Sequence, residues 1–420
     1  MVQLSNYTVP ANATFGWVDQ PNQRGTMDVI WSCLLVVFTS TWTVLHIHLP
    51  MPDESYWITL LRKTRWSIFT VFAPEGVTLL AACQKSSAQK SVKEMHALGV
   101  DHWTTVHGFF ADSGGFMLHP PDSPPFPINT RAIHYLIKGK YLDAPTVSKK
   151  ELWDRSKADR FAKIVAIVQS TYLVVQCIAR PIQGLKVSCL ELTSVAYVLC
   201  TATSYFFWID KPLGVETTIE LPITTPMATI LREAGNIARF PYKDTPMDFV
   251  EQPGWSAWKR RPLFQRFGGL SKRPIQRIPN DFISPDFSMR VSVAIWALTV
   301  VHAAIHLAGW NFDYPTVVER WLWRCSSSAL LGVQFIFGFV AIWSIKPEFD
   351  FKMTAFGFWK KDTSRDTIFR RYGVDIPASA TAAIYFLARM ALLAESFASL
   401  RHMNGTVFTT VDWSEFIPHF

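Results

Sequence analysis

The sequence predicts an all-α integral membrane protein with seven or eight transmembrane helices in a single bundle. The 420-residue chain is 49% hydrophobic and only 18% charged, whereas a soluble domain carries about 25% charged residues. Its apolar residues form separate runs close to the ~20 residues that a helix needs to cross a bilayer core. The net charge of +8 comes from basic residues between these runs, as in cytoplasmic loops of membrane proteins. We therefore expect membrane lipid as a partner, and no nucleic acid.

Seven apolar segments are predicted to span the membrane, and an eighth segment is ambiguous. Residues 103–119 are aromatic but include His107 and Asp112, so we interpret them as a re-entrant or interfacial helix that could also be a true span. The seven predicted spans are about 27–49, 66–83, 161–180, 187–209, 291–309, 326–345 and 378–400.

The chain divides into a polar N-terminal segment at 1–26, a polytopic membrane domain at 27–400 and a C-terminal tail at 401–420. Within the domain, residues 210–290 are rich in proline and basic residues and are predicted to form a long surface loop. Seven spans would place the N-terminus in the cytosol and the C-terminus in the lumen, whereas eight would place both on one side. The endoplasmic reticulum is the expected compartment. The glycosylation candidates are Asn6, Asn12 and Asn404.

Glu75 is the first candidate catalytic residue. Counted from Trp66, it lies about 14 Å along a helix, near the middle of a bilayer core. A carboxylate at that depth normally faces a protein interior and marks a functional site. The preceding Pro74 removes a backbone donor and is expected to free a carbonyl there. Glu75 is either a proton donor or a hydrogen-bonding partner of a neighbouring helix, and the sequence favours neither.

Other polar residues lie in apolar segments. Asp112 and His107 form either a proton-transfer pair or a hydrogen-bonded anchor. Arg389 and Glu395 are six residues apart, too far for the usual contact along one helix, so we expect each to reach a different partner.

Histidines raise the possibility of a metal site. His302 and His306 share one helix face, a pattern that could bind haem or a metal. The clustered histidine boxes of membrane desaturases are missing, and the six cysteines have no CxxC spacing. We therefore predict no metal and no cofactor.

Aromatic residues are abundant, with 17 Trp and 31 Phe. Some are expected at the membrane interfaces, and others could line an apolar cavity in which aromatic faces stabilise a cation. A buried acid beside such a cavity would suit a cyclisation of polyenes that starts with protonation.

Several segments resemble a group of fungal polytopic proteins that includes the integral membrane terpene cyclases of meroterpenoid pathways, such as those making ascofuranone and macrophorins. The resemblance runs nearly end to end. Its segments are RGTMDVIWSCLLVVFTSTWTVLHIHLP (24–50), APE (73–75), HGFFADSGGF (107–116), ARPIQGLKVSCLELTSVAYVLCTATSYFFWIDKPLGV (179–215) and TTVDWSEFIPHF (409–420).

The resemblance implies a metal-independent cyclase that protonates the terminal olefin or epoxide of a farnesyl chain on a meroterpenoid precursor. It also implies a functional association with a prenyltransferase and an oxygenase of the same pathway. The chain has no DDxxD or DxDD motif, and the nearest string, NDFISPD at 280–286, lies in the proline-rich loop.

In this hypothesis Glu75 is the general acid, and Asp112 or His107 is a second donor, relay or terminal base. Two alternatives remain open. One is a transporter or receptor for a lipophilic metabolite, with Glu75 and Arg389 as contacts. The other is a membrane oxidoreductase that uses His302 and His306.

Overall fold

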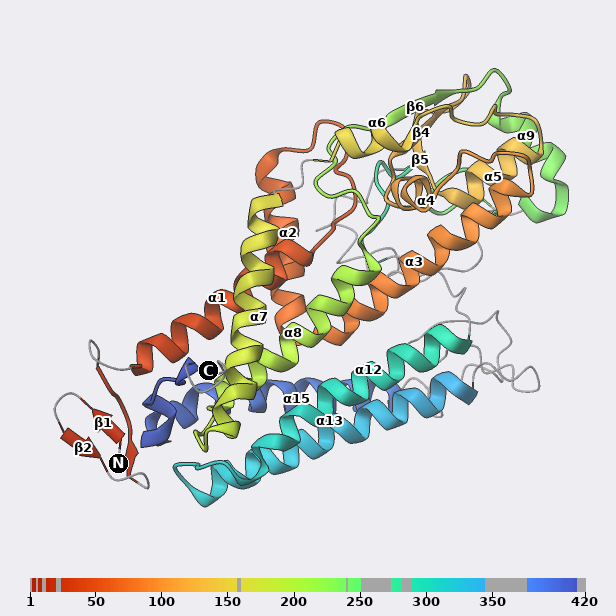
Figure 1. Ribbon diagram of the computed structural model, residues 1–420. Helices are drawn as coiled ribbons and strands as arrows, with labels where there is room; N and C mark the ends of the chain where they lie inside the picture. Colours follow the sequence, from red (N-terminus) through yellow and green to blue (C-terminus); the bar gives the residue numbers. More distant parts are fainter. Residues whose placement is uncertain are drawn as a thin grey trace.

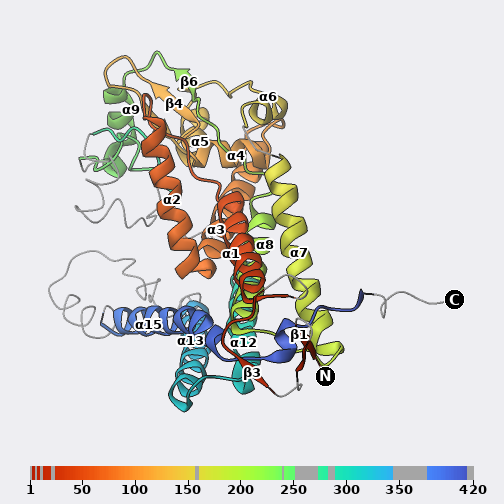
Figure 2. The same cartoon turned by 90° about the vertical axis from the view of Figure 1, so that its left-hand side faces the viewer.

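The chain folds into a bundle of helices with a small cap of strands and short helices at one end (Figure 1). The described parts of the N-terminal segment and of the C-terminal tail lie near the opposite end of the bundle (Figures 1 and 2). In this computed structural model the described residues are 2–4, 7–9, 13–19, 24–156, 160–238, 241–250, 273–281, 289–343 and 376–413.

Long helices form the bundle, which confirms the mostly helical fold. Except for 66–83, each predicted span coincides largely with one helix. The bundle helices are α1 (Thr26–Val44), α2 (Tyr56–Phe72), α3 (Pro74–His96), α7 (Arg160–Ile182), α8 (Cys189–Phe207), α12 (Met289–Leu307), α13 (Val317–Trp343) and α15 (Ile376–Ala398).

Within the described residues, five helices are long and apolar enough to cross a membrane: α1, α7, α8, α12 with the following turn, and α15. The bent pair α2–α3 would make a sixth if it counts as one span. The predicted span in α13 is not among them. The count of seven or eight stays a prediction.

The predicted span at 66–83 is wrong as a single helix. The chain breaks at Ala73, and α2 and α3 meet at an angle of 115°. Pro74 explains the break, because it disfavours helical geometry in the residue before it and is well suited to the first position of a new helix. Ala73 accordingly leaves the helical region, with φ −142° and ψ 64°. Glu75 is therefore in the first turn of α3 and not in the middle of a helix.

The two arms of this bent pair return to the same end of the molecule. Leu49, shortly before α2, and Met95, near the end of α3, belong to one hydrophobic core. The Leu49 amide also donates to the Ser113 carbonyl of the cap, at 3.1 Å. The pair is therefore a helical hairpin with its ends at the cap and its turn, at Ala73–Glu75, inside the bundle.

The cap contains a three-stranded sheet in the order β5–β4–β6. Strand β4 pairs antiparallel with β5 and parallel with β6. The sheet packs with short helices around a core that includes Trp103, Phe110 and Phe116. The cap elements are α4 (Thr105–Asp112), β4 (Phe116–His119), β5 (Phe126–Ile128), α5 (Thr130–Lys138), α6 (Lys149–Asp154), β6 (Ile219–Pro222), α9 (Met227–Ala234) and the 3₁₀ turn Gly235–Ala238.

The cap corrects two sequence predictions. Segment 103–119 is not a span: its helix α4 has eight residues, too few to cross a bilayer, and strand β4 follows. The predicted loop at 210–290 contains β6 and α9, although residues 251–272 and 282–288 lie outside the described part. The aromatic side chains that gave 103–119 its apolar character fill the core of the cap instead.

The N-terminal segment and the C-terminal tail pair with each other. Strand β3 (Thr14–Phe15) lies antiparallel to β7 (Met403–Asn404), which follows the turn Ser399–Arg401. A further turn, Gly405–Phe408, continues the tail, and a hairpin of β1 (Val2–Leu4) and β2 (Tyr7–Val9) precedes β3. Chain ends that look separate in the sequence thus form one unit.

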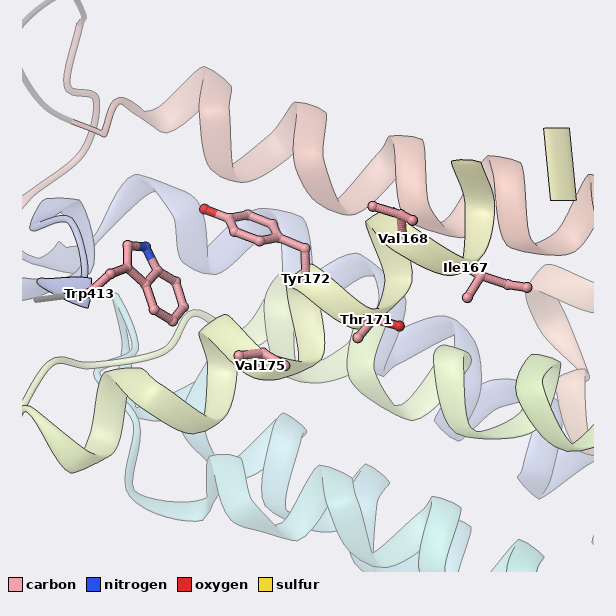
Figure 3. Close-up of a pocket in the computed structure, with 6 residues that line it drawn as sticks. All are labelled: Ile167, Val168, Thr171, Tyr172, Val175 and Trp413. Carbon is pink, nitrogen blue, oxygen red and sulfur yellow. The ribbon is translucent and has the colours of Figure 1, made fainter. Parts of the chain in front are cut away.

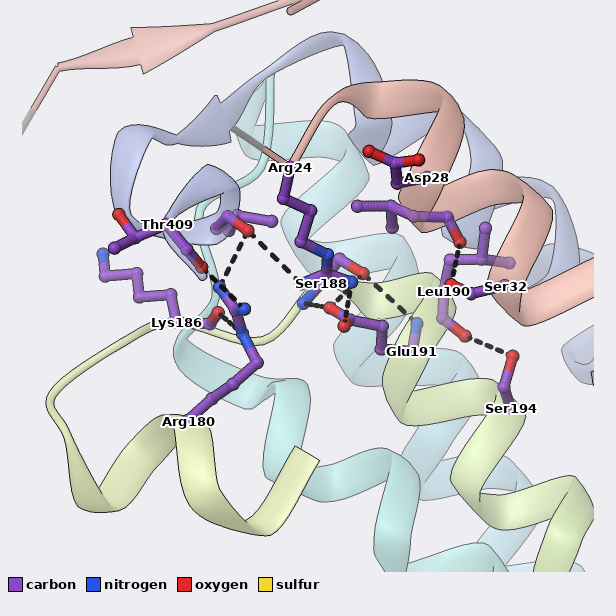
Figure 4. Close-up of polar contacts among 12 residues, drawn as sticks. Arg24, Asp28, Ser32, Arg180, Lys186, Ser188, Leu190, Glu191, Ser194 and Thr409 are labelled. Atoms are coloured by element: carbon purple, nitrogen blue, oxygen red, sulfur yellow. Dashed lines mark hydrogen bonds and ion pairs between the residues drawn. The ribbon is translucent and has the colours of Figure 1, made fainter. Parts of the chain in front are cut away.

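Two buried arginines fasten this unit to the bundle (Figure 4). Arg24 pairs with Glu191 at the start of α8, and both are almost fully buried. Arg180 of α7 donates to the Lys186 carbonyl at 2.9 Å and to the Thr409 carbonyl at 3.0 Å. Its Nη2 donates to two more carbonyls of the tail, those of residues 406 and 407. Each donor of a charged guanidinium that is buried in this way needs an acceptor, so the tail is part of the fold.

We predict that Arg180→Met loosens the tail. Removing these charged hydrogen bonds should lower the free energy of unfolding by about 3 kcal/mol and allow protease cleavage within 403–413. Unfolding in detergent, followed by tryptophan fluorescence, measures the first effect. The control is Lys186→Met, which removes an exposed ion pair with Asp313 and should cost at most about 1 kcal/mol. Equal stability of the two variants would contradict this role of Arg180.

Candidate active site

The turn between α2 and α3 places Glu75 among three other bundle helices. Glu75 is only 6% exposed. Its Oε1 lies 2.7 Å from Nδ1 of His302 in α12. Its Oε2 accepts a hydrogen bond of 2.7 Å from the Tyr385 hydroxyl in α15. Each oxygen therefore has one close neighbour that can hold a proton. Only the contact with Tyr385 has hydrogen-bond geometry, and Oε1 and the His302 Nδ1 make no hydrogen bond among the described residues.

The broken helix makes this arrangement possible. The first turn of a helix has backbone N–H groups without intrahelical acceptors and favours negative charge. Because Pro74 begins α3, Glu75 lies in such a turn. The same turn brings the Phe72 carbonyl close to Tyr385, 3.3 Å from its hydroxyl.

Arg389 and His306 extend the site, one turn further along their helices. Nη1 of Arg389 lies 3.3 Å from Nε2 of His306. The guanidinium of Arg389 also stacks over the ring of Tyr197 in α8, with 4.8 Å from Cζ to the ring centroid. Arg389, His302 and His306 have no solvent exposure. The two histidine rings are 5.4 Å apart edge to face, which confirms that they share a helix face.

Several polar atoms in this cluster make no hydrogen bond within the described residues. They are Oε1 of Glu75, both ring nitrogens of His302, Nε and Nη2 of Arg389, and the hydroxyl of Tyr197. Buried polar groups are normally hydrogen-bonded, and each exception calls for an explanation such as a ligand or water. The cluster thus combines a buried contact between a carboxyl group and an imidazole with donors that lack a partner among these residues.

The structure separates Asp112 and His107 from Glu75. Asp112 accepts from Ser87 in α3 at 2.7 Å and from the amide and hydroxyl of Thr130 at 3.1 and 2.8 Å. Ser87 is twelve residues after Glu75 on the same helix, about 18 Å along its axis. Burial raises the pKa of Asp112, while its hydrogen bonds oppose the shift. This side chain ties the cap to α3.

His107 also has local partners. Its Nδ1 accepts from the Thr104 amide at 3.1 Å, and its Nε2 lies 2.9 Å from the Val147 carbonyl. Burial lowers the pKa of His107, which favours the neutral ring that these bonds require. Among the described residues no hydrogen bond joins His107 to Asp112, and each fits the predicted anchor better than the predicted proton-transfer pair.

The remaining candidates lie elsewhere. No ion pair joins Arg389 and Glu395 among the described residues; Glu395 is 2% exposed, and its Oε1 has no hydrogen bond there. Asn404 is 5% exposed, and its side chain accepts from the Thr406 amide and hydroxyl. Asn6 and Asn12 lie outside the described residues, as does most of NDFISPD at 280–286.

Sequence reasoning missed Tyr385 as a partner of Glu75 and did not connect His302 to it. His302 was noted only as half of a possible metal pair. Within the ranges that the structure describes, no group of three or more His, Cys, Asp or Glu side chains is arranged to hold a metal ion. A possible signal was the presence of polar residues at similar depth in α3, α12 and α15.

A second buried polar cluster lies where the bundle meets the cap. The Lys211 ammonium, 2% exposed, donates to the His46 carbonyl at 2.7 Å and to Oε1 of Gln84 at 2.8 Å. Gln84 also accepts from the Trp208 indole at 2.9 Å, and its amide nitrogen lies 3.1 Å from Nε2 of His48. Burial lowers the pKa of Lys211 to about 7, although Asp112 opposes the shift.

An apolar groove lies on the outer face of α7 (Figure 3). Its volume is about 590 Å³. Trp413 of the tail forms one end, with its ring 6.2 Å from that of Tyr172, and two hydrogen bonds between Gln183 and Asp412 hold the tail there. The lining residues are Ile167, Val168, Thr171, Tyr172, Val175 and Trp413. The groove is on α7 and the tail, whereas the Glu75 cluster belongs to α3, α8, α12 and α15.

Comparison with known proteins gives one match. The model of a family described as "Family of unknown function (DUF8562)" matches residues 2–231 and 287–420. No curated protein and no solved structure matches the chain. The match covers the Glu75 cluster, the cap helices α4, α5 and α6, and the C-terminal tail.

Lys211 gives the fold a predicted pH dependence. In the unfolded chain the Lys211 amine has its ordinary pKa of 10.5, whereas in the folded protein its pKa is about 7. Between these values the unfolded state binds more protons, so stability should rise with pH, by up to about 2 kcal/mol from pH 7 to pH 9. Lys211→Met should flatten this rise in thermal unfolding experiments, whereas Lys149→Met, at an exposed position, should keep it. A wild-type profile that falls over this range would exclude the effect.

Proposed function

Since the chain belongs to the DUF8562 family, whose function is unknown, we propose a function from the site itself: a membrane-embedded terpene cyclase. It protonates the terminal olefin or epoxide of the farnesyl-derived chain of a meroterpenoid precursor, with Glu75 as the general acid. The observation that carries the proposal is the buried contact of Glu75 with His302 and Tyr385.

In this proposal the bundle crosses the membrane and the α2–α3 hairpin is re-entrant. The hairpin enters from the cap side and returns to it, so its turn carries Glu75 to membrane depth. Helices α1, α7, α8, α12, α13 and α15 make the crossings, an even number. An even number agrees with the pairing of β3 and β7, which brings both chain ends to one side. The endoplasmic reticulum is the proposed membrane.

The chemistry requires one proton to enter and one to leave. The Glu75 O–H bond breaks as a C–H bond forms at the terminal alkene carbon, or as the epoxide oxygen is protonated and its C–O bond opens. The resulting cation is captured by internal double bonds, and the last cation loses its proton to the imidazole of His302 to give an isomer of the substrate. Protein groups act as acid and base in such steps when they lie within hydrogen-bond reach of the reacting atoms.

His302 reloads the acid in this scheme. Its Nδ1 is in direct contact with Glu75 Oε1, so a proton on the imidazole can return to the carboxylate after each turnover. The Tyr385 hydroxyl holds the other oxygen and fixes the carboxyl plane. The aromatic faces of Tyr197 and Tyr385 lie nearby and can stabilise cationic intermediates.

The other residues and partners predicted from the sequence have supporting roles in this proposal and do not react with the substrate. Asp112 and His107 hold the cap over the hairpin. No metal or cofactor is used. A hydrocarbon chain of membrane lipid occupies the groove on α7, because that helix is a candidate span whose apolar window is only 11% buried. A prenyltransferase supplies the substrate and an oxygenase acts in the same pathway.

One observation favours a second candidate, a carrier or receptor for a lipophilic metabolite. Deep in the bundle beside Glu75, Arg389 has donors without a partner in the part of the chain that the structure describes, and such a pair of opposite charges would hold a polar group of a transported molecule. A carrier would leave the bonding of the molecule unchanged, whereas the cyclase converts it into an isomer.

We predict that Glu75→Gln abolishes cyclisation while the protein still accumulates in membranes. The amide keeps the volume and can still contact Tyr385, but it cannot donate a proton to an alkene. Microsomes supplied with a farnesylated phenolic precursor, or its terminal epoxide, are assayed by mass spectrometry and chromatography for an isomer of equal mass. A loss on the order of 100-fold or more is expected.

The matched control is Glu395→Gln, the same change at another buried glutamate, which should keep most of the activity. Turnover near the wild-type rate in Glu75→Gln would remove Glu75 from the chemistry. A wild-type protein that binds the precursor but never changes it would support the carrier.

A further inference from the structure

Arg389 has one edge of its guanidinium unused. Nη1 contacts His306, while Nε and Nη2 make no hydrogen bond in the part of the chain that is described. These two N–H groups lie on the same edge and point in parallel, the geometry that binds both oxygens of a carboxylate. The side chain has no solvent exposure, so bulk water does not satisfy this edge.

The charges around Arg389 do not balance when Glu75 carries its proton. The titratable groups that face the site are Glu75 from α3, Tyr197 and Cys200 from α8, His302 and His306 from α12, and Tyr385 from α15. Glu75 is the one carboxylate among these groups. If it is ionised, it compensates Arg389, with both histidines neutral. If it is protonated, as an acid catalyst must be, the buried guanidinium has no counter-charge, which is strongly unfavourable at membrane depth.

We propose that the free edge of Arg389 binds a carboxylate group of the molecule on which the protein acts, and that the Glu75–His302 pair takes up one proton as it binds. This rests on the proposed function, because it identifies the substrate as an acidic one. One negative charge and one proton enter together, so the net charge of the site does not change.

The coupling gives Arg389 a role that a lysine would not fill. The arginine edge fixes the orientation of the carboxylate through two parallel bonds, whereas an ammonium offers a single point charge. The ring of Tyr197 lies against the guanidinium and supports its plane. An empty site keeps Glu75 ionised and inactive, and an occupied site supplies the acid with its proton.

The experiment measures binding and proton uptake together. Purified full-length protein in detergent is titrated with benzoate as the carboxylate probe and with benzamide as its neutral match. Calorimetry at one pH in two buffers of different ionisation enthalpy gives the number of protons taken up per bound probe. We expect about one proton for benzoate and at least about tenfold weaker binding of benzamide.

Variants separate the two parts of the proposal. Arg389→Gln should weaken benzoate binding on the order of 100-fold, and Arg389→Lys, which keeps the charge, about tenfold. Glu75→Gln should still bind benzoate but take up no proton. Glu395→Gln, a buried glutamate elsewhere on α15, should bind like the wild type with the same proton uptake. If Arg389→Gln does not fold, the measurements on the wild type, Arg389→Lys and Glu75→Gln still test both carboxylate binding and proton uptake.

Three results would overturn the proposal: no benzoate binding by the wild type at millimolar concentration, equal affinity for benzoate and benzamide, or benzoate binding without proton uptake. Failure of the cyclase proposal is a different result. Coupled uptake of benzoate and a proton in a protein that produces no isomer would keep the anion site and favour the carrier.

Discussion

The contact between Glu75 and His302 is the interaction on which the arrangement of the bundle depends. A buried carboxyl group needs polar neighbours, and here they come from two helices far away in the sequence; Tyr385 is 310 residues from Glu75. To reach them, the chain must turn inside the bundle, and it does so at Ala73–Pro74 with a bend of 115°. One proline thus ends α2, starts α3 and directs the acid at α12 and α15.

Arginines secure the two regions of the bundle in different ways. Around Arg180 every guanidinium nitrogen has a carbonyl acceptor, and such a fully satisfied cluster holds the fold together. Around Arg389 two nitrogens have none among the described residues. Since both side chains are fully buried, the difference lies in their partners. An arginine whose hydrogen bonds are all satisfied is best explained by a structural role. An arginine with unsatisfied donors is best explained by a role in binding a ligand.

The sequence predicted most of the helices, because the length of an apolar run directly limits what it can form. It also predicted that His302 and His306 share a face and that Arg389 and Glu395 do not pair. It could not predict the break at Pro74, since a proline in an apolar run is compatible with a kinked helix or with two helices. The aromatic residues of 103–119 were assigned to a membrane, but they fill the core of a cap whose strand β6 comes from a distant segment. The Glu75–His302 contact depends on the packing of helices, which no local pattern reports.

The most direct test of this account is whether the two ends of the α2–α3 hairpin face the same side of the membrane. Single cysteines at Tyr56, 69% exposed at the start of α2, and at Ala97, exposed just after α3, would be introduced one at a time. The background carries Cys325→Ser to remove an exposed native thiol. Sealed vesicles are then labelled with a membrane-impermeant maleimide before and after permeabilisation. The account predicts that both positions react from the same side, whereas labelling from opposite sides would show a broken span and contradict the re-entrant turn that carries Glu75.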